Sequence, residues 1–479
     1  MTGPVLAVDQ GTSGTKALVV CPVRGVIGSA SAPVRPRYLP GGRVEVDPRE
    51  LLESVLDAGR AALAAAGEPV AAVGLANQGE TVLAWDPASG EPLTDAIVWQ
   101  DRRAERLCTE LAPRAELLRE RTGLPLDPYF AAPKMAWIRR HLTRHGVVTT
   151  SDVWLVHRLT GAFVTDAATA GRTQLLDLDT VDWSPEAVDA FGLTGERLPE
   201  VVDADTRVGT TTAFGPPLPL TGLLVDQQAA LLAQRVTEPG TAKCTYGTGA
   251  FLLAQSGPRP RRSTTGLVGC VAWRLGGETS YCLDGQVYTA ASAVRWLTDL
   301  GVISGAEDID AVGATAPDSG GVTFVPALAG LAAPWWRGDL RGSVTGLGLD
   351  TTAGHLVRAL CDGIAAQVAE LADAVAADLG TPLTALRVDG GLTRSALLMQ
   401  AQADLLQIPV EVSALPDVTA LGVGAVARLG LDPSLTVHEA VPEWRPSAVY
   451  EPGAGSGQHA AERRARFRTA VSALLDGPA

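Results

Sequence analysis

A carboxylate ends the first apolar run of the chain and could take part in phosphate chemistry. Residues 5–8 are apolar, Asp9 follows, and a turn of glycine and hydroxyl residues leads into a second apolar run from Lys16. This pattern predicts a β-hairpin. Turn amides and the hydroxyls of Thr12, Ser13 and Thr15 could approach phosphates, and Asp9 could hold Mg²⁺ directly or through water. Taken alone, an ordinary polar hairpin is the simpler interpretation.

Two further glycine turns strengthen the phosphate interpretation. Residues 241–253 repeat the order strand, Gly/Thr turn, strand, and Asp389-Gly390-Gly391 ends another apolar run. Three turns at which backbone can approach a ligand closely fit a nucleotide held between two halves of similar plan. The sequence contains no GxxxxGK[ST] motif, which excludes a P-loop enzyme, and no GxGxxG after a strand, so a dinucleotide-binding fold is unsupported. The HRD and DFG motifs of a protein kinase are also absent.

Asp226 lies where the apolar run 223–225 gives way to a helical pattern. One interpretation is a helix N-cap. The other is a base that accepts the proton of a substrate hydroxyl during its attack on a γ-phosphate. The sequence leaves both open.

Polar residues follow two other predicted strands, in the segments 77–81 and 98–103. Amides and carboxylates suit the hydroxyls of a polyhydroxy ligand, and the indole of Trp99 suits its C–H face. A solvated loop with a core tryptophan is the competing interpretation.

The elements that must position these residues alternate between strand and helix, which predicts an α/β protein. Strands are expected over 70–75 and 96–99. Helices are expected over 51–66, 104–118 and 355–379, and a Leu-rich helix after the glycine turn at 389–391 should end at about residue 406. Another helix should begin at about 417, with Asp417 or Thr419 as its N-cap. A flexible loop over 452–457 should precede a short terminal helix.

Length and charge exclude several classes of protein. The 479 residues predict two or three domains and a sizeable core. With 39 Lys and Arg against 53 Asp and Glu, the net charge of −14 argues against nucleic acid or an anionic membrane as the main partner. The six cysteines form no CxxC pair, and there is no signal-peptide pattern or apolar stretch long enough to cross a bilayer. We therefore expect a cytoplasmic protein with reduced thiols.

Taken together, ordered segments from Asp9 to about Gly430 resemble the FGGY carbohydrate kinases, and among them most closely the glycerol kinases. The segments are DQGTSGTKALV, NQGET, AIVWQDRR, DPYFAAPKMAWI, RTQLLDLDTVDW, DQQAAL, AKCTYGTGAFLL, GLAAPWW, RGSVTGL, ALRVDGG and VTALG. The resemblance implies two actin-like (RNase H-like) ATPase domains around an interdomain cleft, here expected at residues 1–236 and 237–479. It also implies ATP and Mg²⁺, a small polyol or sugar as substrate, and a homodimer or homotetramer.

The resemblance implies roles for individual positions. Asp226 would be the base and Asp9 would lie near Mg²⁺. The acceptor pocket would comprise Gly79, Glu80, Trp99, Tyr129, Asp226, Gln227 and Phe251. The nucleotide would be bound by Thr12, Ser13, Gly14, Lys16, Thr248, Ala291, Arg295, Gly390, Gly391 and Ser395, where Ala291, Arg295 and Ser395 replace the Gly, Gln and Asn usual in glycerol kinases.

Two departures from the glycerol kinase pattern bear on specificity and regulation. Gly79 stands where those enzymes have an arginine that hydrogen-bonds glycerol, so open volume is expected beside Glu80, and glycerol should bind about 10- to 100-fold more weakly unless another group substitutes. Residues 215–217 read Gly-Pro-Pro where enzymes inhibited by fructose 1,6-bisphosphate have a GTR turn, so no such inhibition is expected.

The sequence therefore predicts an ATP-dependent kinase of a small polyol or sugar, with glycerol as the leading acceptor. A kinase of a longer polyol or ketose, such as a tetritol or pentulose, is the alternative that Gly79 suggests. A non-catalytic sugar or nucleotide sensor with the same fold is an alternative of another class, and a chaperone-type ATPase would not need the pocket segments.

Overall fold

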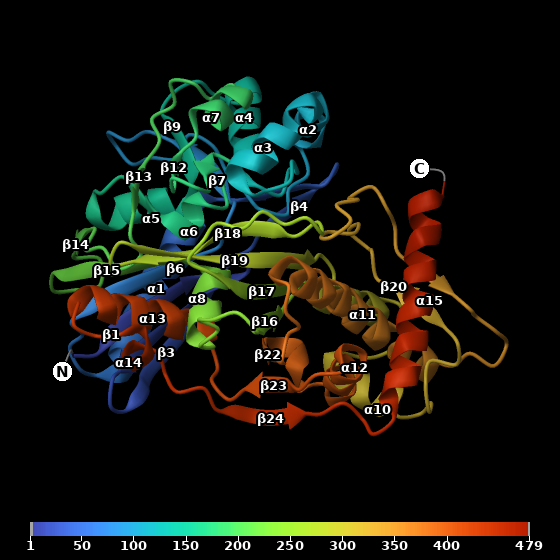
Figure 1. The fold of residues 1–479 in the computed structure, drawn as a ribbon. Coiled ribbons are helices and arrows are strands. Elements are labelled where there is room, and N and C mark those ends of the chain that lie inside the picture. The colour runs from blue at the N-terminus through green and yellow to red at the C-terminus, as the bar shows by residue number, and fades with distance from the viewer. Residues whose placement is uncertain (1–2, 478–479) are drawn as a thin grey trace.

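The computed structural model describes residues 3–477, and its first half is built on a six-stranded sheet (Figure 1). The sheet has the order β14-β15-β6-β1-β2-β3. The strands are β1 (Val5–Gln10), β2 (Gly14–Cys21), β3 (Gly25–Pro33), β6 (Ala72–Asn77), β14 (Gly209–Thr211) and β15 (Leu218–Val225). β1 and β2 form the predicted antiparallel hairpin, with Asp9 opposite Lys16, while β6 runs parallel to β1 and to β15.

The second half repeats this plan in a seven-stranded sheet of order β18-β19-β17-β16-β22-β23-β24. The strands are β16 (Thr241–Tyr246), β17 (Ala250–Gly257), β18 (Val268–Leu275), β19 (Glu278–Val287), β22 (Ala385–Asp389), β23 (Val410–Ser413) and β24 (Pro446–Tyr450). The hairpin β16–β17 corresponds to β1–β2, and the parallel strands β22 and β23 correspond to β6 and β15. The predicted pair of similar halves in an α/β fold is therefore confirmed.

Helices cover both faces of each sheet, which explains why strands such as β1 are buried along almost their whole length. On the first sheet, α1 (Pro48–Ala66) packs on one face, and α8 (Asp226–Ala233) with α13 (Val418–Leu431) packs on the other. On the second sheet, α11 (Ala353–Leu379) packs against β17 and β19, and α12 (Ala396–Leu406) packs against α11.

Helix α13 joins the two halves, because in sequence it lies between β23 and β24 of the second sheet yet it packs on the first sheet (Figure 1). The approach is close, since a Cβ on Gly74 of β6 would lie 2.6 Å from the carbonyl oxygen of Val423. Because Gly74 has no side chain, the backbones of strand β6 and helix α13 can come into direct contact.

The first half also contains a smaller five-stranded sheet, β4-β5-β8-β7-β9. Its strands are β4 (Arg37–Leu39), β5 (Arg43–Val46), β7 (Val82–Trp85), β8 (Ala96–Ile97) and β9 (Val147–Thr150). The other elements of the first half are α2 (Glu105–Glu110), α3 (Ala115–Thr122), α4 (Ala131–His141), α5 (Ser151–Thr160), α6 (Ala167–Ala170), α7 (Pro185–Ala190), β10 (Val164–Asp166), β11 (Leu176–Asp177), β12 (Asp182–Trp183) and β13 (Glu200–Val202). Those of the second half are α9 (Ala291–Asp299), α10 (Ile309–Gly313), α14 (Val437–Ala440), α15 (Ser456–Asp476), β20 (Thr323–Val325) and β21 (Ser343–Thr345).

Two local predictions were wrong, and a third holds only in part. The helix expected over 104–118 is divided into α2, a 3₁₀ turn at Ala112–Arg114 and α3, because Pro113 lacks the N–H that a continuous helix needs. The terminal helix α15 spans 21 residues and is not short. Asp417 occupies the N-cap position of α13, as predicted, but its side chain makes no capping hydrogen bond, because its backbone is left-handed (φ 56°) and its carboxylate pairs with Lys16.

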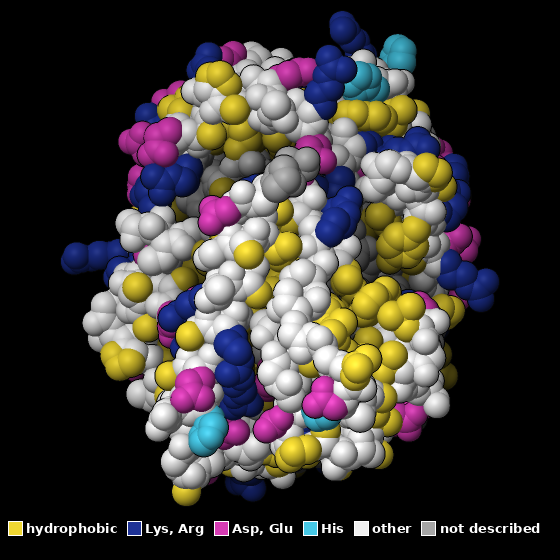
Figure 2. Space-filling view, turned by 90° about the vertical axis from the view of Figure 1, so that its right-hand side faces the viewer, with side chains coloured by type: hydrophobic (Ala, Val, Ile, Leu, Met, Phe, Trp, Pro, Cys, Tyr) yellow, Lys and Arg dark blue, Asp and Glu magenta, His cyan; other side chains and the backbone are white. Residues whose placement is uncertain are grey.

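On the face in Figure 2, basic and acidic side chains are interspersed. Within residues 3–477 no helix has the length and apolar character needed to span a membrane. All six cysteines are free thiols.

Candidate functional site

A cavity of about 190 Å³ collects residues from both halves of the molecule. From the first half it takes the β1–β2 turn, the segment after β6 and the start of α8, and from the second half the β16–β17 turn and β19. The residues that line it are Thr12, Ser13, Gly79, Glu80, Trp99, Tyr129, Arg172, Val225, Asp226, Gln227, Gln228, Thr245, Gly247, Thr248, Phe251 and Asp284. All seven predicted acceptor-pocket residues are in this set, together with the predicted phosphate residues Thr12, Ser13 and Thr248.

Three aromatic rings form one part of the cavity wall. Trp99 meets Tyr129 edge to face with centroids 5.6 Å apart, and meets Phe251 in the same manner at 5.8 Å. The indole Nε1 of Trp99 donates a hydrogen bond of 2.8 Å to Oγ1 of Thr12, which joins this wall to the β1–β2 turn. Trp99 is therefore a wall of the cavity and not only a core residue.

The turn that carries Tyr129 is held by buried charges. Nζ of Lys134 donates to the carbonyl oxygens of Pro128 (2.9 Å) and Phe130 (2.6 Å), and the Asp127 carboxylate accepts the N–H of Tyr129 (2.8 Å). Burial lowers the pKa of Lys134 to about 8. This local network fixes the direction of the tyrosine ring.

Asp226 is the first residue of α8, and the N-cap position belongs to Val225. The N-cap interpretation was therefore wrong, and the carboxylate instead lines the cavity, with Oδ1 accepting the N–H of Gln227 at 2.7 Å. Burial, and next the negative charge of Glu80, raise the pKa of Asp226 to about 7. A carboxylate with this pKa can take up a proton near neutral pH.

A network of side chains joins Gln227 to the second sheet. Nζ of Lys243 donates to Oε1 of Gln227 (2.5 Å) and to Oγ1 of Thr245 (3.1 Å), and that hydroxyl donates to Oδ1 of Asp389 (2.6 Å). Burial lowers the pKa of Lys243. The start of α8 is thus tied to the strand β16 and to the end of β22.

Asp9 and Lys16 lie on the hairpin next to the cavity but do not line it. Burial, followed by the charges of Asp226 and Asp417, raises the pKa of Asp9 to about 8. Lys16 forms an exposed ion pair with Asp417. Gly14, at the start of β2, also lies outside the cavity lining.

A second cavity of about 340 Å³ contains two of the other predicted nucleotide residues, Gly391 and Ser395. Ser395 caps α12 and donates 2.5 Å to Asp310, so its hydroxyl is already engaged. Gly390 has φ 98°, and a Cβ there would lie 2.4 Å from the carbonyl oxygen of Tyr246, which only glycine tolerates.

Helix α9 supplies the remaining two predicted nucleotide residues, and neither lines the two cavities. The N–H of Ala291 bonds to the carbonyl of Gly247, so the helix starts against the β16–β17 turn. Arg295 lies exposed one turn further along.

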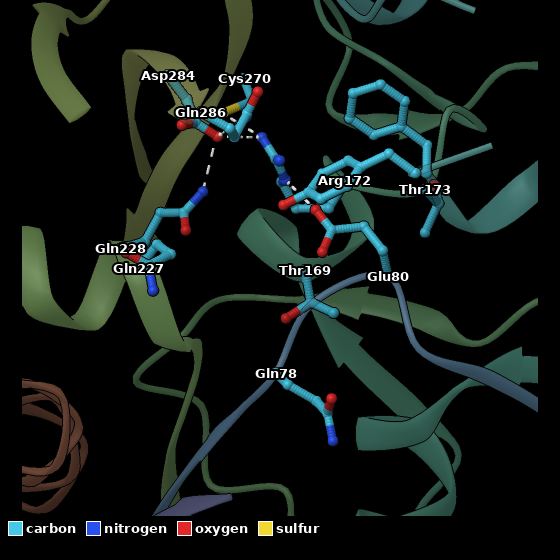
Figure 3. Close-up of polar contacts among 12 residues, drawn as sticks. Gln78, Glu80, Thr169, Arg172, Thr173, Gln227, Gln228, Cys270, Asp284 and Gln286 are labelled. Carbon is cyan, nitrogen blue, oxygen red and sulfur yellow. Dashed lines mark hydrogen bonds and ion pairs between the residues drawn. The ribbon is translucent and has the colours of Figure 1, made fainter. Parts of the chain in front are cut away.

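The largest correction concerns the space beside Glu80. Part of it is filled, because Arg172 lies there and donates from Nε to Oε1 of Glu80 at 2.6 Å (Figure 3), while Gly79 and Glu80 still line the cavity. A Cβ on Gly79 would meet Val225 at 3.2 Å and the stem of Arg172 at 4.0 Å. Arg172 was not predicted as a site residue, although it begins the RTQLLDLDTVDW segment that carried the resemblance.

Two family domains match the chain and cover most of it. The FGGY family of carbohydrate kinases matches with its N-terminal domain over residues 4–233 and with its C-terminal domain over residues 242–430. The chain belongs to the FGGY family of carbohydrate kinases. This FGGY protein is therefore an ATP-dependent phosphotransferase that uses an alcohol group as acceptor, and ATP is its co-substrate.

Relatives of this FGGY kinase include glycerol kinases. The glycerol kinase of Gloeobacter violaceus is 44% identical over 90% of this chain and 88% of its own, and that of Thermus brockianus is 42% identical over 93% and 96%. The crystal structure of Plasmodium falciparum glycerol kinase with ADP superposes with a TM-score of 0.89 at 29% identity, over 100% of this chain and 99% of that one. A ligand-bound xylulose kinase from Lactobacillus acidophilus, at 20% identity and TM-score 0.89 over 99% of each chain, shares the fold.

Proposed function

We propose that this FGGY kinase transfers the γ-phosphoryl group of ATP to glycerol. The observation that carries the proposal is the single cavity that joins a carboxylate poised to accept a proton, an aromatic wall and the hydroxyl-bearing turns of both halves. The similarity to glycerol kinases over most of the chain supports glycerol as the acceptor.

The cavity wall suits a small polyol. The rings of Trp99, Tyr129 and Phe251 offer apolar faces to its carbon atoms, while Glu80 and Asp226 can accept hydrogen bonds from its hydroxyls. We infer that Gly79 and Gln227 complete this pocket.

Asp226 would act as the base. Its carboxylate would accept the proton of the acceptor hydroxyl as that oxygen forms a bond to the γ-phosphorus, and the bond from the γ-phosphorus to the β,γ-bridging oxygen would break to release ADP. The hydroxyls of Thr12, Ser13 and Thr248 and the neighbouring turn amides would orient the phosphates. Closure of the two halves around the cavity would exclude water and align the groups.

Asp9 would hold Mg²⁺ directly or through water. Among residues 3–477 no three metal-ligating side chains are grouped as a site, but Mg²⁺ usually keeps several waters and binds through one or two carboxylates and the substrate phosphates. The residues fit such an ion, since burial, and next the charges of Asp226 and Asp417, raise the pKa of Asp9, and a cation would offset both the burial and the repulsion. When bound, Mg²⁺ supplies charge neutralisation at the phosphates.

The nucleotide would extend from the two hairpin turns toward the second cavity. Gly14 and Lys16 would face the phosphates, and Gly390, Gly391 and Ser395, with Ala291 and Arg295 of α9, would lie along the nucleoside. Because Ser395 already caps α12, its contribution would be through backbone and shape.

We further infer a cytoplasmic enzyme with two domains, residues 1–236 and 237–479, that assembles as a homodimer or homotetramer. The repeated sheet plan supports the division. Light scattering after gel filtration tests the assembly.

The test is ADP release by the purified protein with glycerol, erythritol, ribitol, dihydroxyacetone and xylulose, each over a wide concentration range. Saturable turnover with glycerol at the lowest concentrations is expected. Weak activity with glycerol and strong activity with a longer acceptor would refute glycerol as the substrate, and no acceptor-dependent ADP release would favour a sensor. Asp226→Asn serves as the background control, since it removes the proposed base and keeps the side-chain shape.

A further inference from the structure

A buried group of three charged side chains lies beside the acceptor pocket. Arg172, in the turn between α6 and β11, donates from Nε to Glu80 at 2.6 Å and from Nη1 to Asp284 of β19 at 2.7 Å. Each of the three side chains is only 4–5% exposed. Figure 3 shows the guanidinium between the two carboxylates. One arginine thus joins the two halves of the molecule at the cavity wall.

The guanidinium is held in one orientation. It lies over the rings of Tyr129 and Phe130, with its carbon 5.7 and 5.4 Å from their centroids. Its Nη1 also contacts Sγ of Cys270 at 3.7 Å. Stacking and two charge-assisted hydrogen bonds fix the plane of the fork, which a flexible lysine could not reproduce.

One nitrogen of the Arg172 guanidinium, Nη2, takes no part in these contacts. Nε and Nη1 are occupied, whereas within residues 3–477 no acceptor bonds to Nη2. Arg172 also lines the cavity. An oriented pair of N–H donors is therefore available to a ligand there.

Glu80 adds a second reason to expect a ligand contact at this place. Its backbone is left-handed (φ 55°), a conformation that glutamate adopts at a cost and that persists when its surroundings hold it. The hydrogen bond from Arg172 holds the Glu80 carboxylate at the cavity in this conformation. Donor and acceptor groups are thereby placed side by side, as a hydroxyl requires.

We propose that Arg172 is a specificity-determining residue that binds the acceptor, with Nη2 donating a hydrogen bond to a hydroxyl that is not phosphorylated. It would supply the guanidinium that residue 79 lacks. The inference rests on the proposed function, and it names the group that recognises the substrate.

The test compares glycerol with two diols. 1,2-Propanediol lacks one terminal hydroxyl of glycerol, and 1,3-propanediol lacks the central hydroxyl. The wild-type enzyme should prefer glycerol to at least one diol by about 10- to 100-fold in kcat/KM, the range expected for a hydrogen bond to a charged group. Arg172→Lys should lose most of that preference, because its kcat/KM should fall for glycerol and not for the diols. Its KM for ATP should stay within about twofold of wild type. Arg274→Lys, which alters an arginine paired with Asp203 away from the cavity, is the matched control and should keep the preference.

The outcomes separate the two proposals. A wild-type enzyme that is inactive on glycerol refutes the proposed function and this inference with it. If the wild type is active and its preference for glycerol survives in Arg172→Lys, the inference alone is refuted. The inference alone is also refuted if the variant loses kcat/KM equally for all three acceptors and for ATP. If the lysine variant does not fold, Arg172→Gln gives the same comparison, since glutamine keeps one donor for Glu80. Equal wild-type kcat/KM for glycerol and both diols would also overturn it.

Discussion

Replacing Asp226 by asparagine should abolish turnover and at the same time stabilise the protein above neutral pH. In the fold the pKa of this carboxyl rises from its ordinary 3.8 to about 7, mainly because of burial. At about 1.4 kcal/mol for each pH unit, the full cost of the ionised form is about 4 kcal/mol. Because Asp226 lines a cavity and keeps some contact with solvent, screening should reduce this cost to about 2 kcal/mol.

The sign of the pH dependence follows from the direction of the shift. Below pH 3.8 the carboxyl is protonated in both the folded and the unfolded state, so it costs nothing. Between about pH 4 and 7 the unfolded chain ionises first, and the wild-type free energy of unfolding falls until the full penalty is reached above pH 7. Asparagine does not titrate and can still accept the N–H of Gln227, so the variant avoids the penalty.

The assay is thermal unfolding at pH 5 and pH 8 together with ADP release. At pH 8 the variant should melt about 4–8 °C above wild type, with a smaller gap at pH 5. Asp152→Asn is the matched control, because Asp152 is also buried with a raised pKa but lies away from the cavity. It should gain stability in the same direction and keep turnover. Near-normal turnover in Asp226→Asn would remove Asp226 from the role of base, and a melting temperature that falls at pH 8 would refute the electrostatic reasoning.

The remaining predictions concern pH, the phosphate hairpin and regulation. The kcat/KM for the acceptor should rise with pH through about 7 and then level, as Asp226 loses its proton, and a flat profile of initial rates from pH 5.5 to 8 would contradict this. Lys16→Met should raise KM for ATP by about tenfold and leave KM for the acceptor unchanged. It should change the free energy of unfolding by less than about 1 kcal/mol, because the pair with Asp417 is half exposed; equal effects on both KM values would argue against a phosphate contact. Millimolar fructose 1,6-bisphosphate should leave the rate unchanged, since residues 215–217 carry no arginine; strong inhibition would overturn that prediction.

Local sequence determined the elements that depend on near neighbours. The hairpins at Asp9 and at the Gly/Thr turn after β16 follow from apolar runs broken by turn residues, and both are present. The ordered motif segments identified the family, and the acceptor-pocket residues that they predicted line one cavity. Apolar periodicity also predicted one helix over 104–118 where the chain forms two. A periodic apolar pattern can continue through a proline such as Pro113, although the helix cannot.

Only the tertiary structure decided which charged groups meet. Arg172 lies 92 residues from Glu80 and 112 from Asp284, and Lys16 pairs with Asp417 across 401 residues. No periodicity reports such pairs, because they arise when α13 packs on the first sheet and β18, the neighbour of β19, packs on α6. The sequence alone revealed that position 79 lacks an arginine. That a buried guanidinium lies beside Glu80 depends on how the chain folds back on itself, since an ionised carboxylate is costly to bury unless the fold brings it a partner.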